Sequence, residues 1–182
     1  MPGDPVKDGE EVAVLETGKG KIVIRFFPNK APKHVESFKK LVNSGFYNGT
    51  KFHRTIEGFM IQGGDPNTKK GDPSTWGQGD PGYSLQAEFN NIRHKRGIVS
   101  AARSMDPNSA GSQFFVVVSD TSPTGGAWDN LDGQYTVFGE VVSGMDAVDK
   151  IVKTPLIGGD GQADPKHVVA ITSSKIEQWP VK

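Results

Sequence analysis

The stretch with the strongest chemical character is residues 52–65, which read FHRTIEGFMIQGGD. It contains two short β-prone runs, and strand side chains alternate between the two faces of a sheet. Phe52 and Arg54 are therefore predicted to share one face, and Met60 and Gln62 to share a face of the second run. A guanidinium among apolar groups is costly to bury unless its donors are used. This grouping predicts a cavity that holds an apolar residue and hydrogen-bonds the amide beside it.

Most other kinds of chemistry lack their residues. The chain contains no cysteine, which excludes disulfides, thiol nucleophiles and thiolate metal sites. No Gly-x-Ser-x-Gly elbow occurs, no serine is placed by a motif near a histidine, and neither paired carboxylates nor a phosphate-binding glycine motif is evident. The histidines lack metal-ligand spacing and are interpreted as surface or loop residues: His34, His53, His94 and His167. We therefore predict no metal and no cofactor.

One reaction needs no more than such a cavity, namely rotation about an X-Pro peptide bond. Amide resonance sets its barrier at about 18–20 kcal/mol, and the uncatalysed rotation takes roughly tens to hundreds of seconds. In the twisted state resonance is lost and the prolyl nitrogen becomes basic. A fixed donor from Arg54 aimed at that nitrogen would stabilise the twisted state more than the planar one, which lowers the barrier.

Periodicity predicts two helices and about eight short strands around this stretch. The strands are expected in a hairpin over 11–27 and then over 51–56, 59–62, 97–102, 112–118, 136–142 and 167–176, and the helices from Pro32 to 42 and over 145–153. This pattern predicts a mainly β fold, a closed eight-stranded antiparallel β-barrel capped by two α-helices, with a sandwich as the alternative. Long polar loops fill 66–83 and 119–130. Trp76, in the first loop, either caps a pocket or pins the loop to the body.

Length and composition indicate one domain, over residues 11–178, preceded by a polar N-terminal extension over 1–10. The 21 lysines and arginines balance the 21 aspartates and glutamates, and no run of basic residues occurs. Nucleic acid is therefore not predicted as a partner. No run near 18 apolar residues and no signal peptide are present, so we expect no membrane association and a cytoplasmic monomer. A leader removed from the sequence would leave no trace.

Four segments, in order along the chain, resemble the cyclophilin family of peptidyl-prolyl cis-trans isomerases: 52–54 (FHR), 58–65 (GFMIQGGD), 111–115 (GSQFF) and 131–133 (LDG). The similarity runs from about residue 11 to residue 176. It implies an eight-stranded barrel with two capping helices. It also implies an isomerase without covalent intermediate or cofactor that assists protein folding, with proline-containing peptides and unfolded or flexible protein segments as partners.

The resemblance also implies roles for single residues. Arg54 would be the catalytic guanidinium, with Gln62 beside it. The pocket for the proline ring would consist of Phe59, Met60, Phe115 and Leu131, and the substrate backbone would be held by Gln62, Ala102, Arg103 and Gln113. Arg103 matches a position usually occupied by an asparagine that acts through its main chain, and its charge is expected to bias which peptides bind.

Three departures from the family pattern affect these expectations. Asn130 stands where many members have a tryptophan that binds cyclosporin, and Trp128 lies two residues earlier, so we expect weakened cyclosporin binding. Tyr135 replaces a common pocket histidine and keeps an aromatic wall with a polar tip. Met105 is an extra residue in the loop beside the cleft.

Two functions remain open at this point, an active prolyl isomerase and a binding module for proline-bearing segments. Arg54 favours the first, because binding a proline ring does not need a guanidinium. In a third, purely structural reading, Phe59, Met60 and Phe115 are core residues and Arg54 forms a salt bridge on the rim of the barrel.

Overall fold

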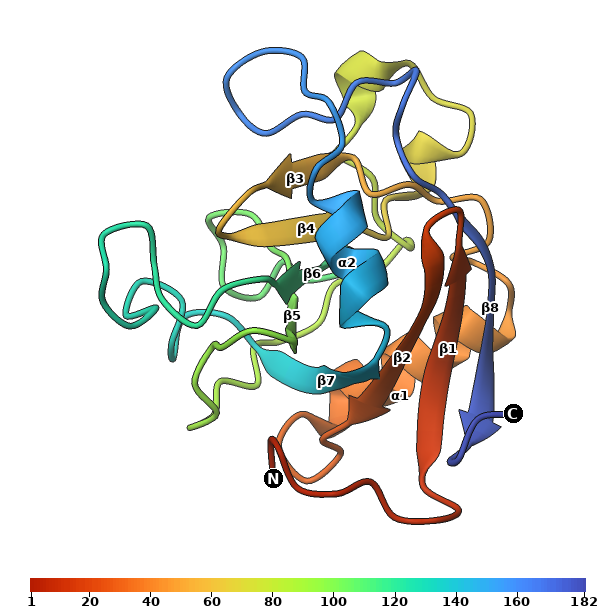
Figure 1. Cartoon of the computed structure of the whole chain (residues 1–182), viewed down its shortest axis with the longest axis vertical. Helices are drawn as coiled ribbons and strands as arrows, with labels where there is room; N and C mark the ends of the chain where they lie inside the picture. The colour runs from red at the N-terminus through yellow and green to blue at the C-terminus, as the bar shows by residue number, and fades with distance from the viewer.

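Eight antiparallel strands form one sheet in the order β3-β4-β6-β5-β7-β2-β1-β8 in the computed structural model, which describes residues 1–182. The strands are β1 Glu11–Thr17, β2 Gly20–Phe26, β3 Arg54–Ile56, β4 Met60–Gly63, β5 Ile98–Ala101, β6 Phe114–Val117, β7 Val137–Ser143 and β8 Ile171–Gln178, and the helices are α1 Pro32–Asn43 and α2 Met145–Ile151 (Figure 1). All the predicted strands and both helices are confirmed. The last strand begins later than predicted because the main chain turns over 164–168, where the N–H groups of His167 and Val168 both donate to Asp164 O.

The sheet is an open half-barrel, so the predicted closed barrel is wrong. Its two edge strands, β3 and β8, share no ladder. The chain before β3 meets the start of β8 only through the isolated bridge between Lys51 and Ala170 and the hydrogen bond from Gly49 N to Ile171 O. The free edge of β3 is covered instead by the loop that precedes β8, because Thr55 N donates to Gly161 O and Arg54 bridges to Gln162. A strand of three residues leaves too few backbone groups to pair with a long eighth strand.

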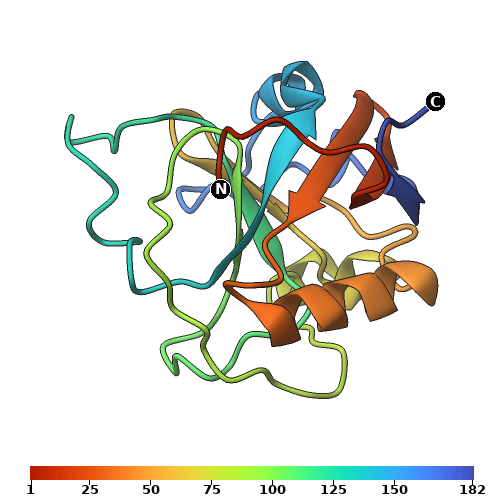
Figure 2. The same ribbon diagram turned by 90° about the horizontal axis from the view of Figure 1, so that it is seen from below.

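The two helices lie on opposite sides of the molecule in Figure 2, with α1 packed against β7 and β8 and α2 against β2. Pro32 begins α1, where its missing N–H would be unpaired in any case. The buried face of α1 includes the residues predicted from helical spacing: Val35, Phe38, Leu41 and Val42. Phe38 lies at the centre of an aromatic cluster, with its ring centroid 4.9 to 5.9 Å from those of Tyr47, Phe138, Phe114 and Phe26. The main core thus fills the space enclosed by the curved sheet and both helices, since Ala147, Val148 and Ile151 of α2 belong to the same cluster.

The N-terminal extension, residues 1–10, lies against the sheet. Arg25 is buried and its guanidinium binds Glu10 at 3.0 Å, Glu140 at 3.5 Å and the main-chain oxygen of Asp4 at 2.8 Å. Val6 packs with Trp179 on the strand residues of β1 and β2. A buried guanidinium needs such partners to be stable, so the extension completes the surroundings of Arg25.

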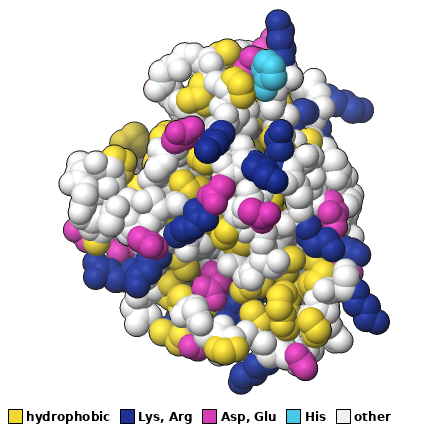
Figure 3. Space-filling view, in the orientation of Figure 1, with side chains coloured by type: hydrophobic (Ala, Val, Ile, Leu, Met, Phe, Trp, Pro, Cys, Tyr) yellow, Lys and Arg dark blue, Asp and Glu magenta, His cyan; other side chains and the backbone are white.

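The surface carries acidic and basic side chains side by side. In Figure 3 both signs are interspersed over the face shown, without a single-sign stripe. None of the helices has the length and apolar character needed to span a bilayer.

Candidate active site

The candidate site lies on the face of the sheet that points away from the main core. Along β4 and β6 the side chains alternate, so that Ile61 and Val116 enter the main core while Met60 and Phe115 join a separate small cluster. Arg54 on β3 pairs with Gln62 on β4, which pairs in turn with Phe115 on β6. Directly paired residues present their side chains on the same face, and a guanidinium, an amide and a phenyl ring therefore form one row across three strands.

A cavity of about 100 Å³ opens beside this row. Its lining consists of six apolar or aromatic residues and three polar ones: Arg54, Phe59, Met60, Gln62, Ala102, Arg103, Phe115, Leu131 and Tyr135. Nine of the ten site residues expected from the sequence are therefore brought together in one pocket, and the tenth, Gln113, lines the cavity next to it.

The guanidinium of Arg54 has hydrogen-bonding capacity to spare. Its Nε donates to the main-chain oxygen of Asp160 at 3.0 Å, and no carboxylate lies within 4.0 Å of it. Its two terminal nitrogens make no hydrogen bond within the protein. The reading in which Arg54 forms a structural salt bridge is therefore wrong, and the arginine offers a fixed cation with free donors to whatever occupies the pocket.

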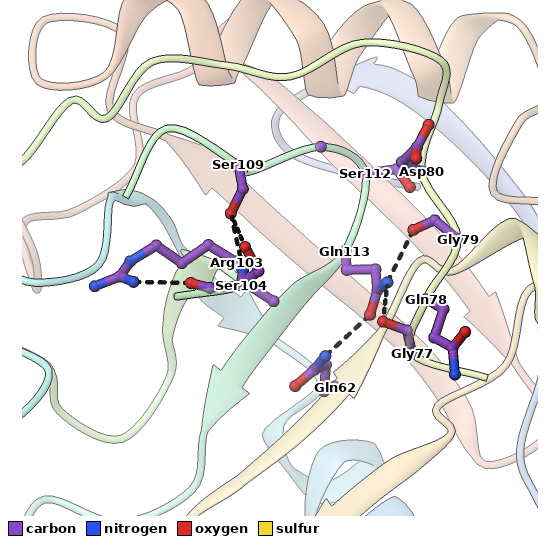
Figure 4. A pocket seen from close by; sticks show the side chains of 12 residues that line it. Gln62, Gly77, Gln78, Gly79, Asp80, Arg103, Ser104, Ser109, Ser112 and Gln113 are labelled. Atoms are coloured by element: carbon purple, nitrogen blue, oxygen red, sulfur yellow. Dashed lines mark hydrogen bonds between the residues drawn. The ribbon is translucent and has the colours of Figure 1, made fainter. Parts of the chain in front are cut away.

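A second, larger cavity of about 360 Å³ adjoins the first and shares Gln62, Ala102 and Arg103 with it. Figure 4 shows how its wall is held. Gln62 Nε2 donates to Gln113 Oε1 at 3.0 Å, and Gln113 Nε2 donates to the main-chain oxygens of Gly77 and Gly79 at 3.0 and 2.9 Å. The Gln113 amide thus fixes the loop over 66–83, whereas Gln62 keeps its own Oε1 free. Direct contact of the Gln113 side chain with substrate stays a prediction.

Asp65, the last residue of the central motif, organises the same loop. Its carboxylate accepts hydrogen bonds from the main-chain N–H groups of Asn67 and Gly77. Two short 3-10 helices that the sequence analysis missed, Pro66–Thr68 and Pro73–Thr75, lie between these two points. Trp76 lines neither cavity, so it does not cap the pocket. Its indole N–H donates to Gly71 O within the loop, and Lys51 Nζ, outside the loop, lies 6.0 Å from its ring centroid, which connects the loop to the body.

Phe52 does not share a face with Arg54, contrary to the alternation expected from the sequence. It is buried in the main core, with its ring centroid 6.2 Å from that of Phe114. Regular strand pairing begins only at Arg54, while Phe52 N donates to Val169 O on the far side of the sheet opening. The irregular backbone over 51–53 breaks the period of two, so the pocket contains no Phe52.

Three of the four histidines are buried: His34, His53 and His94. His53 and His94 lie in loops, as one of the two readings had it. The interpretation as a surface or loop residue is wrong for His34, which lies on the buried face of α1. His94 lies behind the pocket, with its ring stacked on Phe115 at 5.9 Å. Its Nδ1 is 2.8 Å from Asp132 Oδ1 and its Nε2 is 3.1 Å from Ser100 Oγ. No spacing rule could find this serine, histidine and aspartate. Ser100 is fully buried, which keeps any substrate carbonyl out of its reach, and the three groups serve to support Phe115 and Leu131.

Burial lowers the pKa of all three histidines, against the opposing effect of Glu88 on His34, of Asp65 on His53 and of Asp132 on His94. They are therefore neutral in the folded chain at a pH where the unfolded chain binds protons. The free energy of unfolding is expected to be level above about pH 7 and to fall as the pH drops below 6.5, the ordinary histidine value. Urea unfolding at a series of pH values measures this.

A matched pair of variants tests whether the buried histidines cause this pH dependence of stability. Neither ring nitrogen of His53 has a hydrogen-bond partner, so His53→Leu should make the fall between pH 7 and 5 shallower. His167→Gln, which changes an exposed histidine, should leave the curve as it is. A wild-type curve that is flat down to pH 5 would contradict the prediction.

The far wall of the pocket is aromatic and comes from the loop before β7. Trp128 is buried, stacks on Phe59 at 4.9 Å and donates its indole N–H to Ser119 O at 3.0 Å. Tyr135 meets Phe115 edge to face at 5.7 Å. Trp128 does not line the cavity itself but lies behind Phe59, which does, and the sequence analysis had not placed it there. The only sign of this position in the sequence was a large apolar side chain within a polar loop.

Fold and site together define the class of this protein. It is a mainly β protein with a small apolar pocket whose lining contains a fixed arginine with free donors and no serine, threonine or cysteine. Such a pocket is suited to binding a short peptide segment and polarising it without covalent chemistry.

Comparisons with known proteins agree with that class. The family described as "Cyclophilin type peptidyl-prolyl cis-trans isomerase/CLD" matches residues 12–176. A probable peptidyl-prolyl cis-trans isomerase of Brucella abortus is 45% identical over 170 residues, which cover 91% of this chain and 83% of that protein. Peptidyl-prolyl cis-trans isomerase A of Dickeya dadantii is 41% identical over 165 residues, covering 90% of this chain and 83% of the relative.

A solved structure is similar over almost its whole length. The cyclophilin-type isomerase of Cryptosporidium parvum, crystallised in the presence of the dipeptide Ala-Pro, superposes with a TM-score of 0.76 at 28% identity and covers 92% of this chain and 99% of its own. The chain therefore belongs to the cyclophilin-type peptidyl-prolyl cis-trans isomerase family, and it is an isomerase.

Proposed function

We propose that this chain catalyses rotation about X-Pro bonds in proline-containing peptides and in unfolded or flexible protein segments, with Arg54 as the catalytic group. The observation that carries the proposal is the pairing, in one small cavity, of an apolar lining with an arginine whose terminal nitrogens are free. The Ala-Pro dipeptide present with the Cryptosporidium parvum relative supports the substrate class.

In the proposed mechanism the proline ring enters the pocket between Phe59, Met60, Phe115 and Leu131. With the ring held still, rotation of the preceding residue twists the amide bond. The charge distribution of the amide changes only in this twisted state. In that state the lone pair of the nitrogen is no longer delocalised into the carbonyl group, and a terminal N–H of Arg54 donates to it. The aromatic surroundings exclude water, which strengthens the interaction between the cation and the lone pair.

Gln62 is proposed to act beside Arg54. It faces Arg54 across the β3–β4 pair, and its Oε1 accepts no hydrogen bond from the protein. A free acceptor in this position can bind a main-chain N–H of the substrate next to the proline. Ala102 and Arg103 line both cavities, and their main chains are proposed to hold the substrate backbone where it passes between them.

The experiment that tests the function follows the cis-to-trans exchange of a short X-Pro peptide by NMR, without a coupled protease. The wild type should accelerate the exchange far above the rate in buffer. Exchange no faster than in buffer, combined with measurable binding of the same peptide, would replace the isomerase by the binding module.

Weakened cyclosporin binding is a further part of the proposal. Asn130 is exposed, while Trp128 has its indole N–H bonded to Ser119 O and its ring covered by Phe59. Trp128 therefore cannot replace a tryptophan at position 130. Asn130→Trp is expected to tighten cyclosporin binding by about tenfold or more, the effect of a buried aromatic anchor. Calorimetric titration checks this, and equal affinity in wild type and variant would contradict it.

A further inference from the structure

The arginines of the chain divide into two groups. Three of the five are bound to carboxylates: Arg25 to Glu10 and Glu140, Arg93 to Asp129 and Asp132, and Arg96 to Asp149. The other two, Arg54 and Arg103, have no carboxylate within 4.0 Å, and both line the small pocket. Both arginines that lack a carboxylate partner are thus found at the site.

Arg103 is held in a fixed position. Its guanidinium carbon lies 4.5 Å from the centroid of the Tyr135 ring. Its Nε donates to Gln134 O at 2.9 Å, and its Nη1 donates to Ser104 O at 2.9 Å. A guanidinium held by stacking and by main-chain acceptors loses little further freedom when it binds an anion.

One edge of this guanidinium is free. Its Nη2 makes no hydrogen bond in the protein, and no carboxylate lies within 4.0 Å of the guanidinium. Asp80, the one acidic residue that lines the larger cavity, accepts from Gly82 N. Asp106 accepts from Asn108 N, and Asp132 binds His94 and Arg93. Arg103 therefore offers two N–H donors and a full charge to a ligand, and no internal carboxylate competes for them.

The position of Arg103 decides which part of a substrate it meets. In Figure 4 its side chain extends away from Gln113 and Gly79, and so away from the end of the larger cavity that contains Asp80. If the proline occupies the small pocket, one flank of the peptide can extend into the larger cavity, which adjoins it at Gln62, Ala102 and Arg103, and the other beside Tyr135, which lines the small pocket alone. The flank that passes Tyr135 comes within reach of Arg103.

We infer that Arg103, stacked on Tyr135, is a specificity-determining residue that favours proline peptides with an acidic side chain next to the proline. The inference rests on the proposed function and adds the charge preference of the same site. A carboxylate on the flank near Tyr135 accepts from Nη2 in a charge-assisted hydrogen bond, the strongest kind that a half-buried guanidinium forms. Because this contact is the same in the planar and twisted states, it lowers KM and leaves kcat almost unchanged.

A structural role for Arg103 predicts something different. If the side chain only clamped the loop over 103–111 through Ser104 O and Gln134 O, its loss would change the turnover of all peptides by the same factor. The ratio of kcat/KM between two peptides that differ only in charge therefore distinguishes a role in specificity from a structural role.

The test uses two pairs of short peptides, neutral apart from the residue changed. One pair has Glu or Gln immediately before proline, and the other has Glu or Gln immediately after it. NMR exchange gives kcat/KM for each peptide with the wild type, Arg103→Gln and Arg103→Glu. Lys166→Gln, which removes an exposed positive charge elsewhere, is the matched control.

For one of the two pairs the wild type should favour the Glu peptide by about three- to tenfold, the range for a partly exposed charged hydrogen bond. The preference should shrink in about 0.5 M NaCl, where exposed charges are screened. In Arg103→Gln the ratio should fall to about 1, in Arg103→Glu it should invert, and in Lys166→Gln it should stay.

Equal turnover of Glu and Gln peptides by the wild type, or an unchanged preference in Arg103→Gln, would overturn the inference while leaving the isomerase intact. Failure of the wild type to turn over any of the four peptides would instead remove the proposed function and the inference with it. Arg103→Lys keeps the charge and should retain part of the preference, which guards against a folding defect in Arg103→Gln.

Discussion

Replacement of Arg54 by alanine is expected to lower kcat/KM for an X-Pro peptide by about 100-fold, the loss typical of removing one donor aimed at the charge of a transition state. The fall should appear in kcat, because the donor acts on the prolyl nitrogen only after the amide has twisted. Peptide exchange measured by NMR at several concentrations separates kcat from KM. Arg54→Lys should recover only part of the activity, since an ammonium lacks the planar pair of terminal nitrogens.

The stability of Arg54→Ala serves as its control. Arg54 makes one side-chain hydrogen bond, to Asp160 O, and no ion pair, so the free energy of unfolding should change by less than about 1 kcal/mol. A stably folded variant with more than a third of the wild-type activity would rule out Arg54 as the catalytic group. The pocket would then act by holding the proline ring alone.

Regular alternation explains which parts of the site could be predicted from the sequence. Phe114 and Phe115 point to opposite faces of β6 as expected, and Met60 and Gln62 share a face of β4. The prediction that Phe52 shares a face with Arg54 is wrong because regular strand pairing begins only at Arg54. The period of two holds only where a neighbouring strand fixes the backbone, and no local residue pattern shows where that pairing begins.

Contacts between distant segments explain most of what could not be predicted. Arg54 is oriented by Asp160, which lies 106 positions along the chain, and His94 is buried because Asp132 and Ser100 meet it from other elements. The open edge of the sheet has the same origin, since the loop at 160–163 takes the place beside β3 that a closed barrel would give to β8. Composition and spacing carry no information about such partners. The resemblance to the cyclophilin family provided the list of pocket residues before any geometry was known.

Adjacent phenylalanines allow stability and catalysis to be tested with the same chemical change. Phe114 is 1% exposed and its ring lies 5.4 to 6.2 Å from those of Phe38, Tyr47 and Phe52 in the main core. Phe114→Ala should lower the free energy of unfolding by about 3–5 kcal/mol, the usual result of truncating a large core side chain. For a chain of this size that is roughly a 6–20 °C fall in Tm. Calorimetry measures both quantities.

Phe115→Ala should show the opposite balance. Phe115 belongs to the small cluster behind the pocket and contacts the cavity itself, so its truncation leaves an opening to solvent more than a sealed void, and the loss of stability should be smaller than for Phe114→Ala. The proline ring loses the wall against which it is held, and kcat/KM should fall by at least about tenfold. Phe114→Ala, assayed well below its Tm, should keep kcat/KM within about threefold of the wild type, because the main core does not touch substrate. Equal losses of activity in the two variants would mean that the core face and the pocket face of β6 do not act independently. The apolar lining would then owe its position to the whole core, and the pocket could not be altered without altering the fold.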